Sequence, residues 1–220
     1  SMMFNMCVPF EDGVDALAIP TGEPALEYVL EPPTTPTQQD MSRTTFVLER
    51  RLQGFGISNP DIQLDDTQIR VQLPDLGDAD LAQLNGLITQ QGALLFQLVR
   101  ESASFDETPR LEMLEPSPFQ TDIIQRAVIS ESDFGLVIEF DLMADIQDAF
   151  GDFTEANIGR QLAIVFDDEV LMAPTLQARI ETAGLISGNF SATEARVIVA
   201  ALNSGSLPFV LTLVEVRELP

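Results

Sequence analysis

Carboxylates are the side chains of this sequence best suited to chemistry, because the chain contains no histidine. It therefore has no imidazole to act as a general base, to bind a metal ion or to activate a serine or cysteine nucleophile. Two adjacent pairs, Asp65 with Asp66 and Asp167 with Asp168, could act as acid and base or hold a hard cation. Both pairs lie between short apolar stretches, where aspartate favours turns. We interpret them as turn residues and predict that the chain is not an enzyme and holds no cofactor or metal ion.

The glycines do not form a phosphate-binding loop. All eleven basic residues are arginines, and the pattern G-x-x-x-x-G-K-[ST] cannot occur without a lysine. Gly54 and Gly56 follow a helical pattern instead of preceding one. The phenylalanine-rich segment 140–166 could line a peptide-binding groove, but its apolar residues fall at regular helix or strand spacing. We expect these phenylalanines to form part of a core.

The acidic composition restricts the class of partner. Eleven arginines against 35 aspartates and glutamates give a formal net charge of −24. Such a field repels nucleic-acid phosphates and anionic lipid headgroups, so neither is expected as a partner. A basic or apolar partner is compatible with this charge, and so is an acidic surface that only keeps the protein in solution.

The N-terminal tail, residues 1–23, carries the single cysteine, Cys7, so no disulfide can form within the chain. The residues before Cys7 lack the small side chains expected ahead of a lipid-modified cysteine. No apolar run reaches the roughly 18 residues that a membrane-spanning helix needs, and no signal peptide is evident. We expect a disordered tail, and membrane contact only through segments absent from this chain.

Hydrophobic periodicity in the first half predicts an alternation of strands and helices. The expected elements are a strand, a helix, two strands of a hairpin, a helix and a strand, in residues 25–31, 44–55, 62–64, 69–73, 78–92 and 93–100. The Pro- and Thr-rich residues 31–40 form a loop before the first helix, and Asp78 is a plausible N-cap of the second. This order of elements is that of a ferredoxin-like fold.

The second half begins after a boundary in residues 101–118, where periodicity is lost. Its expected strands and helices lie in residues 126–130, 135–140, 143–158, 162–166, 170–174, 184–190 and 191–204. The last of these is a helix that begins with Ser191 and Glu194 at capping-box spacing. Gly205 can end it in a left-handed turn, and Pro208 prevents its continuation. The sequence therefore predicts a mixed α+β protein.

Three segments resemble the extracytoplasmic part of SecD, the accessory subunit of the Sec translocase. They read VLERRLQGFGISNPDIQ with IRVQLP, TEANIGRQLAIVFDDEVLMAP, and ISGNFSATEARVIVAALNSGSLPFVLTLVEVR. The matching positions that the resemblance marks as structural or hinge residues are Arg51, Gly54, Gly56, Asn157, Gly159, Pro174, Gly188, Phe190, Glu194, Ser204, Gly205, Leu207 and Pro208. One departure is that GEPALEYVL stands where the family usually has a Gly-rich Asp-Leu-x-Gly-Gly segment.

The resemblance implies an architecture: a ferredoxin-like base in residues 24–104 plus 206–220, and an inserted α+β head in residues 105–205. Connectors between base and head are then expected near 101–118 and 203–208. The segment from Leu202 to Pro208 is expected to end a helix sharply, so that the chain can return as a strand of the base.

The resemblance also implies a function outside the cytoplasm, on the periplasmic side of the inner membrane. A SecD-like domain is expected to assist protein export by transient binding of unfolded preprotein, by movement of head against base, and in contact with Sec translocase components. The alternative is a stand-alone exported binding module that shares the fold but does not act in translocation.

Overall fold

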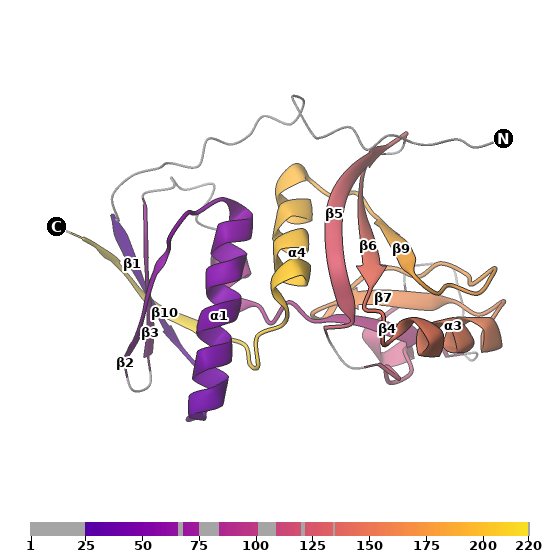
Figure 1. The fold of residues 1–220 in the computed structure, drawn as a ribbon, viewed down its shortest axis with the longest axis horizontal. Coiled ribbons are helices and arrows are strands. Elements are labelled where there is room, and N and C mark those ends of the chain that lie inside the picture. The colour runs from indigo at the N-terminus through magenta and orange to yellow at the C-terminus, as the bar shows by residue number, and fades with distance from the viewer. Residues whose placement is uncertain are drawn as a thin grey trace.

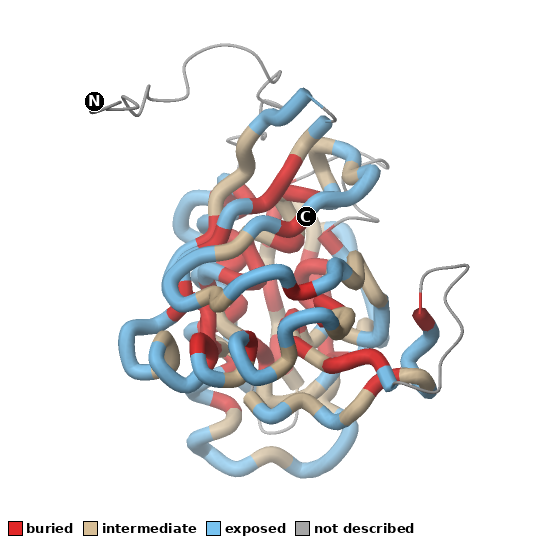
Figure 2. The backbone as a smooth tube through the Cα atoms, turned by 90° about the vertical axis from the view of Figure 1, so that its right-hand side faces the viewer, coloured by how far each residue is buried: buried red, intermediate tan, exposed pale blue. Residues whose placement is uncertain are grey.

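The computed structural model describes residues 25–65, 68–74, 84–100, 109–119, 122–133 and 135–219. The N-terminal tail with Cys7, Asp66 of the first carboxylate pair and the expected N-cap Asp78 lie outside these residues. Figure 1 shows two lobes of mixed helix and strand, with one helix between them. Buried positions run through the middle of the molecule, and exposed positions follow its outline (Figure 2).

The first lobe contains a four-stranded antiparallel sheet. Its strands, in the order β10-β1-β3-β2, are Thr212–Glu218, Leu26–Glu31, Gln68–Leu73 and Asp61–Asp65. Alternation places Ile69, Val71 and Leu73 of β3 on one face, and all three are completely buried. The expected hairpin is confirmed, because β2 and β3 pair in register across the turn after Asp65.

Helix α1, Gln38–Phe55, packs its apolar side into the core of this lobe. It begins earlier than the sequence pattern predicted, because Thr37 and Asp40 form a capping box: each side chain accepts a hydrogen bond from the other residue's backbone N–H. It ends at Gly56, whose φ of 104° is favourable only for glycine. A further helical turn spans residues 84–89, within the helix expected there.

The second lobe contains two three-stranded antiparallel sheets. The first has the order β4-β7-β8, with the strands Leu94–Leu98, Leu162–Phe166 and Glu169–Met172. The second has the order β5-β6-β9, with the strands Ile124–Ser132, Gly135–Leu142 and Ala183–Ser187. Helix α3, Gln147–Ala156, is shorter than the expected 143–158, and a short 3-10 helix spans Leu111–Met113.

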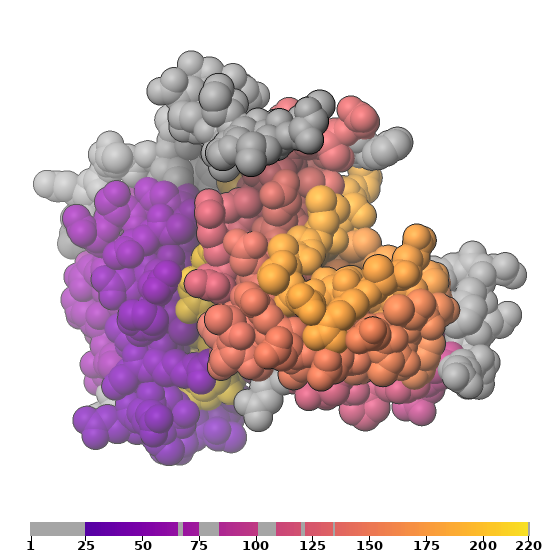
Figure 3. Space-filling view, turned by 45° about the vertical axis from the view of Figure 1, so that its right-hand side comes forward, coloured from indigo at the N-terminus to yellow at the C-terminus, as the bar shows by residue number. Residues whose placement is uncertain are grey.

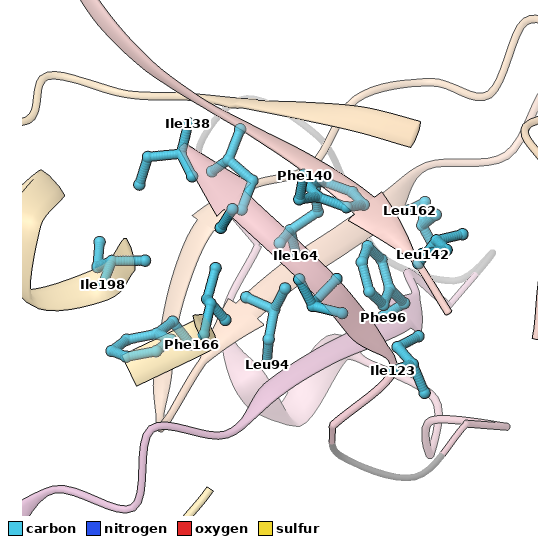
Figure 4. Packing of buried hydrophobic residues seen from close by; sticks show 14 of the residues in the cluster. Leu94, Phe96, Ile123, Ile138, Phe140, Leu142, Leu162, Ile164, Phe166 and Ile198 are labelled. Atoms are coloured by element: carbon cyan, nitrogen blue, oxygen red, sulfur yellow. The ribbon is translucent and has the colours of Figure 1, made fainter. Parts of the chain in front are cut away.

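The core of the second lobe is shared by both of its sheets. Phe96 and Ile164 come from the β4-β7-β8 sheet, and Ile138 and Phe140 from the β5-β6-β9 sheet. All four lie in one buried cluster (Figure 4). The ring of Phe150 on α3 meets that of Phe96 edge-on, with 5.0 Å between centroids. The interpretation of these phenylalanines as core residues is confirmed.

The strand expected in residues 93–100 forms. Its expected place as the last strand of the ferredoxin-like order is wrong, because it does not belong to the sheet of the first lobe. β4 pairs with β7, so it belongs to the second lobe, and β10 occupies the edge of the first sheet beside β1. All five residues of β7 are buried, and β7 is the central strand of its sheet, with β4 on one side and β8 on the other. Periodicity identifies a strand, but it does not identify which strand pairs with it.

Helix α4, Ala192–Ser204, lies between the two lobes (Figure 1) and has apolar contacts on both sides. Ala200 belongs to the core of the first lobe, whereas Ile198 and Leu202 belong to that of the second. Figure 3 shows the first-lobe residues in purple and the second-lobe residues in orange, with residues near the C-terminus in yellow between them. None of the helices in the described ranges is both long and apolar enough to cross a membrane.

Candidate functional site

Arg51 is a completely buried arginine at the point where the chain passes between the lobes. Each of its five N–H groups donates a hydrogen bond, which satisfies the whole guanidinium. The acceptors are the carbonyl oxygens of Leu87, Gln90, Gln91 and Gly205, at 2.9, 2.6, 2.5 and 3.3 Å, and Ser204 Oγ at 3.3 Å. Burial lowers the pKa of Arg51 to about 10, while the nearby carboxylates of Asp167 and Asp122 favour its charged form. The side chain is therefore a cation at neutral pH.

Four of these five acceptors belong to the two segments that connect the lobes, and the fifth, the Leu87 carbonyl, lies in the helical turn just before the first of them. The first connector, residues 90–93, leads into β4, and the second, residues 204–207, leads from α4 towards β10. The two connectors run side by side, because the Leu207 N–H donates to the Gln91 carbonyl at 2.8 Å. The first connector therefore lies before β4, whereas the sequence suggested residues 101–118. Arg51 binds both connectors from α1.

The turn after β7 is tied to the first connector through Asp167. Its Oδ1 accepts from the Ala93 N–H at 2.9 Å, and its own N–H donates to the Ala93 carbonyl at 2.8 Å. Asp167 has a φ of 50°, a conformation that aspartate tolerates better than most residues. Burial raises the pKa of the Asp167 carboxyl, against the opposing effect of hydrogen bonds from Ala93 and Gly92 and of the Arg51 charge.

Asp122 ties the second connector to α1. Its carboxylate accepts hydrogen bonds from the N–H and the hydroxyl of Ser206, at 2.7 and 3.0 Å. The same carboxylate forms an ion pair with Arg43 of α1 at 2.5 Å. We refer to the two connectors and the side chains that bind them as the junction. It contains the buried Arg51 and the partly exposed Arg43–Asp122 ion pair, and both arginines belong to α1 and lie next to residues 204–206.

Asn203 joins the end of α4 to β5. Its side-chain amide donates to the Ala127 carbonyl at 2.8 Å and accepts from the Ala127 N–H at 2.8 Å. These are the two bonds that a residue of a neighbouring strand would make. The chain therefore leaves α4 with its last helical residues fixed on both sides, by β5 and by Arg51.

Two family models match adjoining parts of this chain. The one described as "SecDF, P1 head subdomain" matches residues 119–209, and the one described as "Protein translocase subunit SecDF, P1 domain, N-terminal" matches residues 41–101. Protein translocase subunit SecDF of Thermus thermophilus is 31% identical, over 88% of this chain and 30% of its own length. Protein translocase subunit SecD of Aquifex aeolicus is 29% identical, over 93% of this chain and 43% of its own length. The chain belongs to the SecD/SecDF family.

Two solved SecDF chains are similar in fold to this chain. A crystal structure of SecDF in a super-membrane-facing form superposes with a TM-score of 0.80 at 30% identity, over 88% of this chain and 30% of that one. A second SecDF chain, from a study of the membrane component that enhances protein export, gives a TM-score of 0.77 at 29% identity, over 87% of this chain and 99% of that one. The present chain spans less than half the length of the two SecD and SecDF relatives described above.

The junction gathers four of the predicted family-motif residues. Arg51, Ser204 and Gly205 are in direct contact, and the Leu207 N–H binds the neighbouring connector. Gly205 ends α4 with a φ of 86° but a ψ of 169°, so the expected left-handed turn is replaced by an extended conformation with positive φ. Pro208 follows directly, after the completely buried Leu207.

Gly54 and Gly56, also among the predicted motif residues, lie at the C-terminal end of α1. A Cβ atom on Gly54 would be 3.6 Å from that of Ala200, so α1 and α4 pack closely at this position. Gly56 is the residue that ends α1. Both are next to the junction, but neither contacts the Arg51 guanidinium.

A second group of motif residues lies at the far end of the second lobe, where α3 leads into β7. Asn157 caps α3 and donates to the Phe153 carbonyl at 2.8 Å. Gly159 has a φ of 90°, and the Pro174 carbonyl accepts from the Leu162 N–H at 2.9 Å. These residues shape a turn and its return strand, and the structure does not bring them to the junction.

A third group lies at the start of α4. The ring of Phe190 is so close to Gly188 that a Cβ atom there would be 2.6 Å from Phe190 Cζ. Glu194 accepts from the Ser191 N–H at 2.8 Å, and its own N–H donates to Ser191 Oγ at 3.2 Å, which confirms the predicted capping box.

Four other junction residues were not predicted as such, namely Gly92, Asp122, Asp167 and Asn203. Gly92 is the last residue of the helix expected in residues 78–92, and Asp167 was interpreted only as a turn residue. Asp167 does lie in the β7–β8 turn, but its carboxylate also binds the first connector. No local signal in the sequence reports contacts between residues so far apart along the chain.

Proposed function

We propose that this chain is the extracytoplasmic P1 region of a SecD-like translocation subunit, and that it binds emerging preprotein transiently while its second lobe moves against its first. Family membership supports the role in protein translocation. The related SecDF chain described above is a membrane component that enhances protein export. On this proposal the chain works on the periplasmic side of the inner membrane, in contact with Sec translocase components.

The observation that carries the proposal is the construction of the junction. Within the described ranges, the chain passes between the lobes through two short connectors that are hydrogen-bonded to each other. A rotation about two adjacent connectors changes few backbone angles, which is the usual geometry of rigid-body domain movement. Arg51 binds both connectors, so its hydrogen bonds define the position that the lobes hold at rest.

The same proposal assigns the first lobe as the base of the P1 region and the second lobe as its head. We take the first lobe as a ferredoxin-like base, which is supported by the order β10-β1-β3-β2 with α1 on the sheet and β10 as the fourth strand. The second lobe is a head inserted between the first connector and the second. The position of β4 supports a head that begins near residue 93 in place of 105.

The alternative of a stand-alone exported module is less well supported, because the relatives that match are subunits of the translocase. An enzymatic role has no supporting observation either. In the described residues, no group of three or more Asp, Glu or Cys side chains is arranged to hold a metal ion.

The proposal is tested by measuring the distance between the lobes. Spin labels or fluorophores are attached to Ser58→Cys in the first lobe and Asp148→Cys in the second, in a Cys7→Ser background, because both positions are exposed. A reduced and carbamidomethylated protein, which stays unfolded, is then added. It should bind and should change the distribution of distances between the two labels. Binding without any change would remove the movement from the proposal, and absence of binding at high concentration would overturn the proposal as a whole.

A further inference from the structure

Three adjoining hollows follow the line along which α1, α4 and β5 meet, with volumes of about 560, 740 and 330 Å³. Neighbouring hollows share the lining residues Arg50, Gly54, Ala127, Val128, Val199 and Asn203. We refer to these hollows together as the α4–β5 groove. Its smallest part is mainly apolar and is lined by Ile129 and Leu136 on one side and by Ala192 and Val199 on the other.

Three arginines line the α4–β5 groove in a molecule whose net charge is −24. They are Arg50, Arg126 and Arg196, and no described carboxylate lies within ion-pair distance of any of them. Glu49 and Asp141 also line the groove, in the parts that contain Arg50 and Arg126. Arg196 is the charged residue of the apolar part, so a carboxylate entering there meets a cation next to an apolar surface.

The wall of the groove formed by β5 is the edge of a sheet, since the strand order is β5-β6-β9. The N–H and carbonyl of Ala127 point outward from this edge, where Asn203 binds both. Because outward groups recur at every second residue, those of Ile129 and Glu131 point the same way. Among the described residues, none hydrogen-bonds to the outward backbone groups of Ile129 or Glu131.

Asn203 already pairs with this edge as a residue of an added strand would. Its amide supplies one donor and one acceptor to Ala127, where the two larger parts of the α4–β5 groove adjoin. The next outward groups along β5 belong to Ile129, which lines the apolar part of the groove. An extended segment that continues from Asn203 along β5 would therefore find backbone partners, an apolar surface and Arg196 in sequence.

We propose that the α4–β5 groove binds an extended polypeptide segment as an additional strand on β5, and selects segments in which a large apolar residue stands near an aspartate or glutamate. The backbone groups of Ile129 and Glu131 pair with the segment, its apolar side chain lies against Leu136 and Val199, and its carboxylate binds Arg196. This inference rests on the proposed binding of preprotein and names the class of segment that is bound. The overall acidity favours basic segments, so the groove and the net charge make opposite predictions.

The choice of side chain is tested with three fluorescein-labelled peptides of about nine residues. They share alternating apolar residues and carry Glu, Gln or Lys at the same positions. Fluorescence anisotropy at about 0.15 M salt, where long-range repulsion is largely screened, should give the tightest binding for the Glu peptide. Arg196→Gln should weaken the Glu peptide about three- to fivefold and leave the Gln peptide unchanged. Arg110→Gln removes an exposed arginine outside the groove and should change neither.

The strand pairing is tested with N-methylated versions of the Glu peptide. Methylation of every second amide should abolish binding in one of the two alternating sets, the set that faces β5, and should have little effect in the other. Equal affinity for the Glu, Gln and Lys peptides, no effect of Arg196→Gln, or equal effects of both methylation sets would overturn the inference.

The unfolded protein used to test the proposed function separates the two possible failures. If that protein binds while the peptides show none of the expected differences, the inference fails and the proposed function stands. If neither the unfolded protein nor any peptide binds, both fail together.

Discussion

A Cβ atom on Gly92 would lie 2.2 Å from Nη2 of Arg51, although Arg51 comes from α1 and Gly92 from the first connector. The guanidinium occupies the space that a side chain at position 92 would need. Gly92 also has a φ of 73°, which residues with a side chain rarely adopt. The first connector therefore requires glycine for two separate reasons.

Replacement of Gly92 by alanine should lower the free energy of unfolding by about 3 kcal/mol, because the new methyl group both strains the backbone and displaces Arg51. Gly159→Ala is the matched control. Gly159 has a φ of 90°, but nothing lies within 4 Å of its added Cβ, so only the backbone strain remains. Urea denaturation of both variants measures the difference, and equal losses would show that the contact with Arg51 has no energetic weight.

Arg51→Lys should be destabilising even though it retains the positive charge. A lysine has three donors in place of five and cannot reach both connectors at once, so buried carbonyl oxygens lose their partners. We expect a loss of about 3 kcal/mol in the free energy of unfolding. The same substitution at the exposed Arg110 should cost almost nothing. In the distance measurement between labelled lobes, Arg51→Lys should also broaden the distribution, and a narrow, unchanged distribution would show that Arg51 does not fix the lobes.

Asp167 should make the stability of the chain depend on pH. Burial raises the pKa of its carboxyl, so the folded chain retains this proton at pH values where the unfolded chain has lost it. The contribution of Asp167 to stability therefore falls as the pH rises from the ordinary carboxyl pKa through the raised one, and is constant above it.

Asp167→Asn should remove this part of the pH dependence, because asparagine tolerates the positive φ and can still accept from the Ala93 N–H. Melting temperatures between about pH 4 and pH 8 should show a smaller decline for Asp167→Asn than for the unmodified chain. Asp168→Asn, at the exposed neighbouring position, should keep the decline. Parallel curves for the unmodified chain and Asp167→Asn would contradict the prediction.

Asn203→Asp should weaken the attachment of α4 to β5. The carboxylate keeps an acceptor for the Ala127 N–H but loses the donor, and it places a negative charge against the Ala127 carbonyl. We expect a loss of about 1–2 kcal/mol in the free energy of unfolding. Faster hydrogen exchange in β5 around Ala127 would accompany it. Asn85→Asp changes an exposed side chain in the first lobe and serves as the control, and equal stability of the two variants would refute the prediction.

Much of the secondary structure followed from the sequence, because burial on one face leaves a regular apolar pattern. The β2–β3 hairpin is of this kind, and the capping box of Ser191 with Glu194 followed from the spacing of its two side chains. The start of α1 was missed, although Thr37 and Asp40 stand at capping-box spacing, because the prolines before them favoured a loop. The pairing of β4 was missed because it depends on a strand far along the chain.

The junction could not be derived from side-chain patterns for a different reason. Four of the five acceptors of Arg51 are backbone carbonyl oxygens, which every residue type supplies. The segments that bind Arg51 therefore need a particular backbone course. Only two positions need a particular residue type: Gly92, where a side chain would clash with Arg51, and Ser204, whose hydroxyl accepts a hydrogen bond. Resemblance to the SecD family marked Arg51, Ser204 and Gly205 as motif residues, but it did not say that they meet.

Because Leu207 and Gln91 are hydrogen-bonded to each other, the stability of the first-lobe sheet depends little on the size of the second lobe. For the sheet of the first lobe, residues 92–206 act as one long loop, and the hydrogen bond between Gln91 and Leu207 holds the two ends of that loop together. The entropy of closing a loop grows only slowly with its length, so the size of the carried lobe has little effect on the stability of the sheet below it. Lobes of different size or shape could be exchanged at this point without altering the strand order β10-β1-β3-β2, provided that α4 is kept, because its Ala200 belongs to the core of the first lobe.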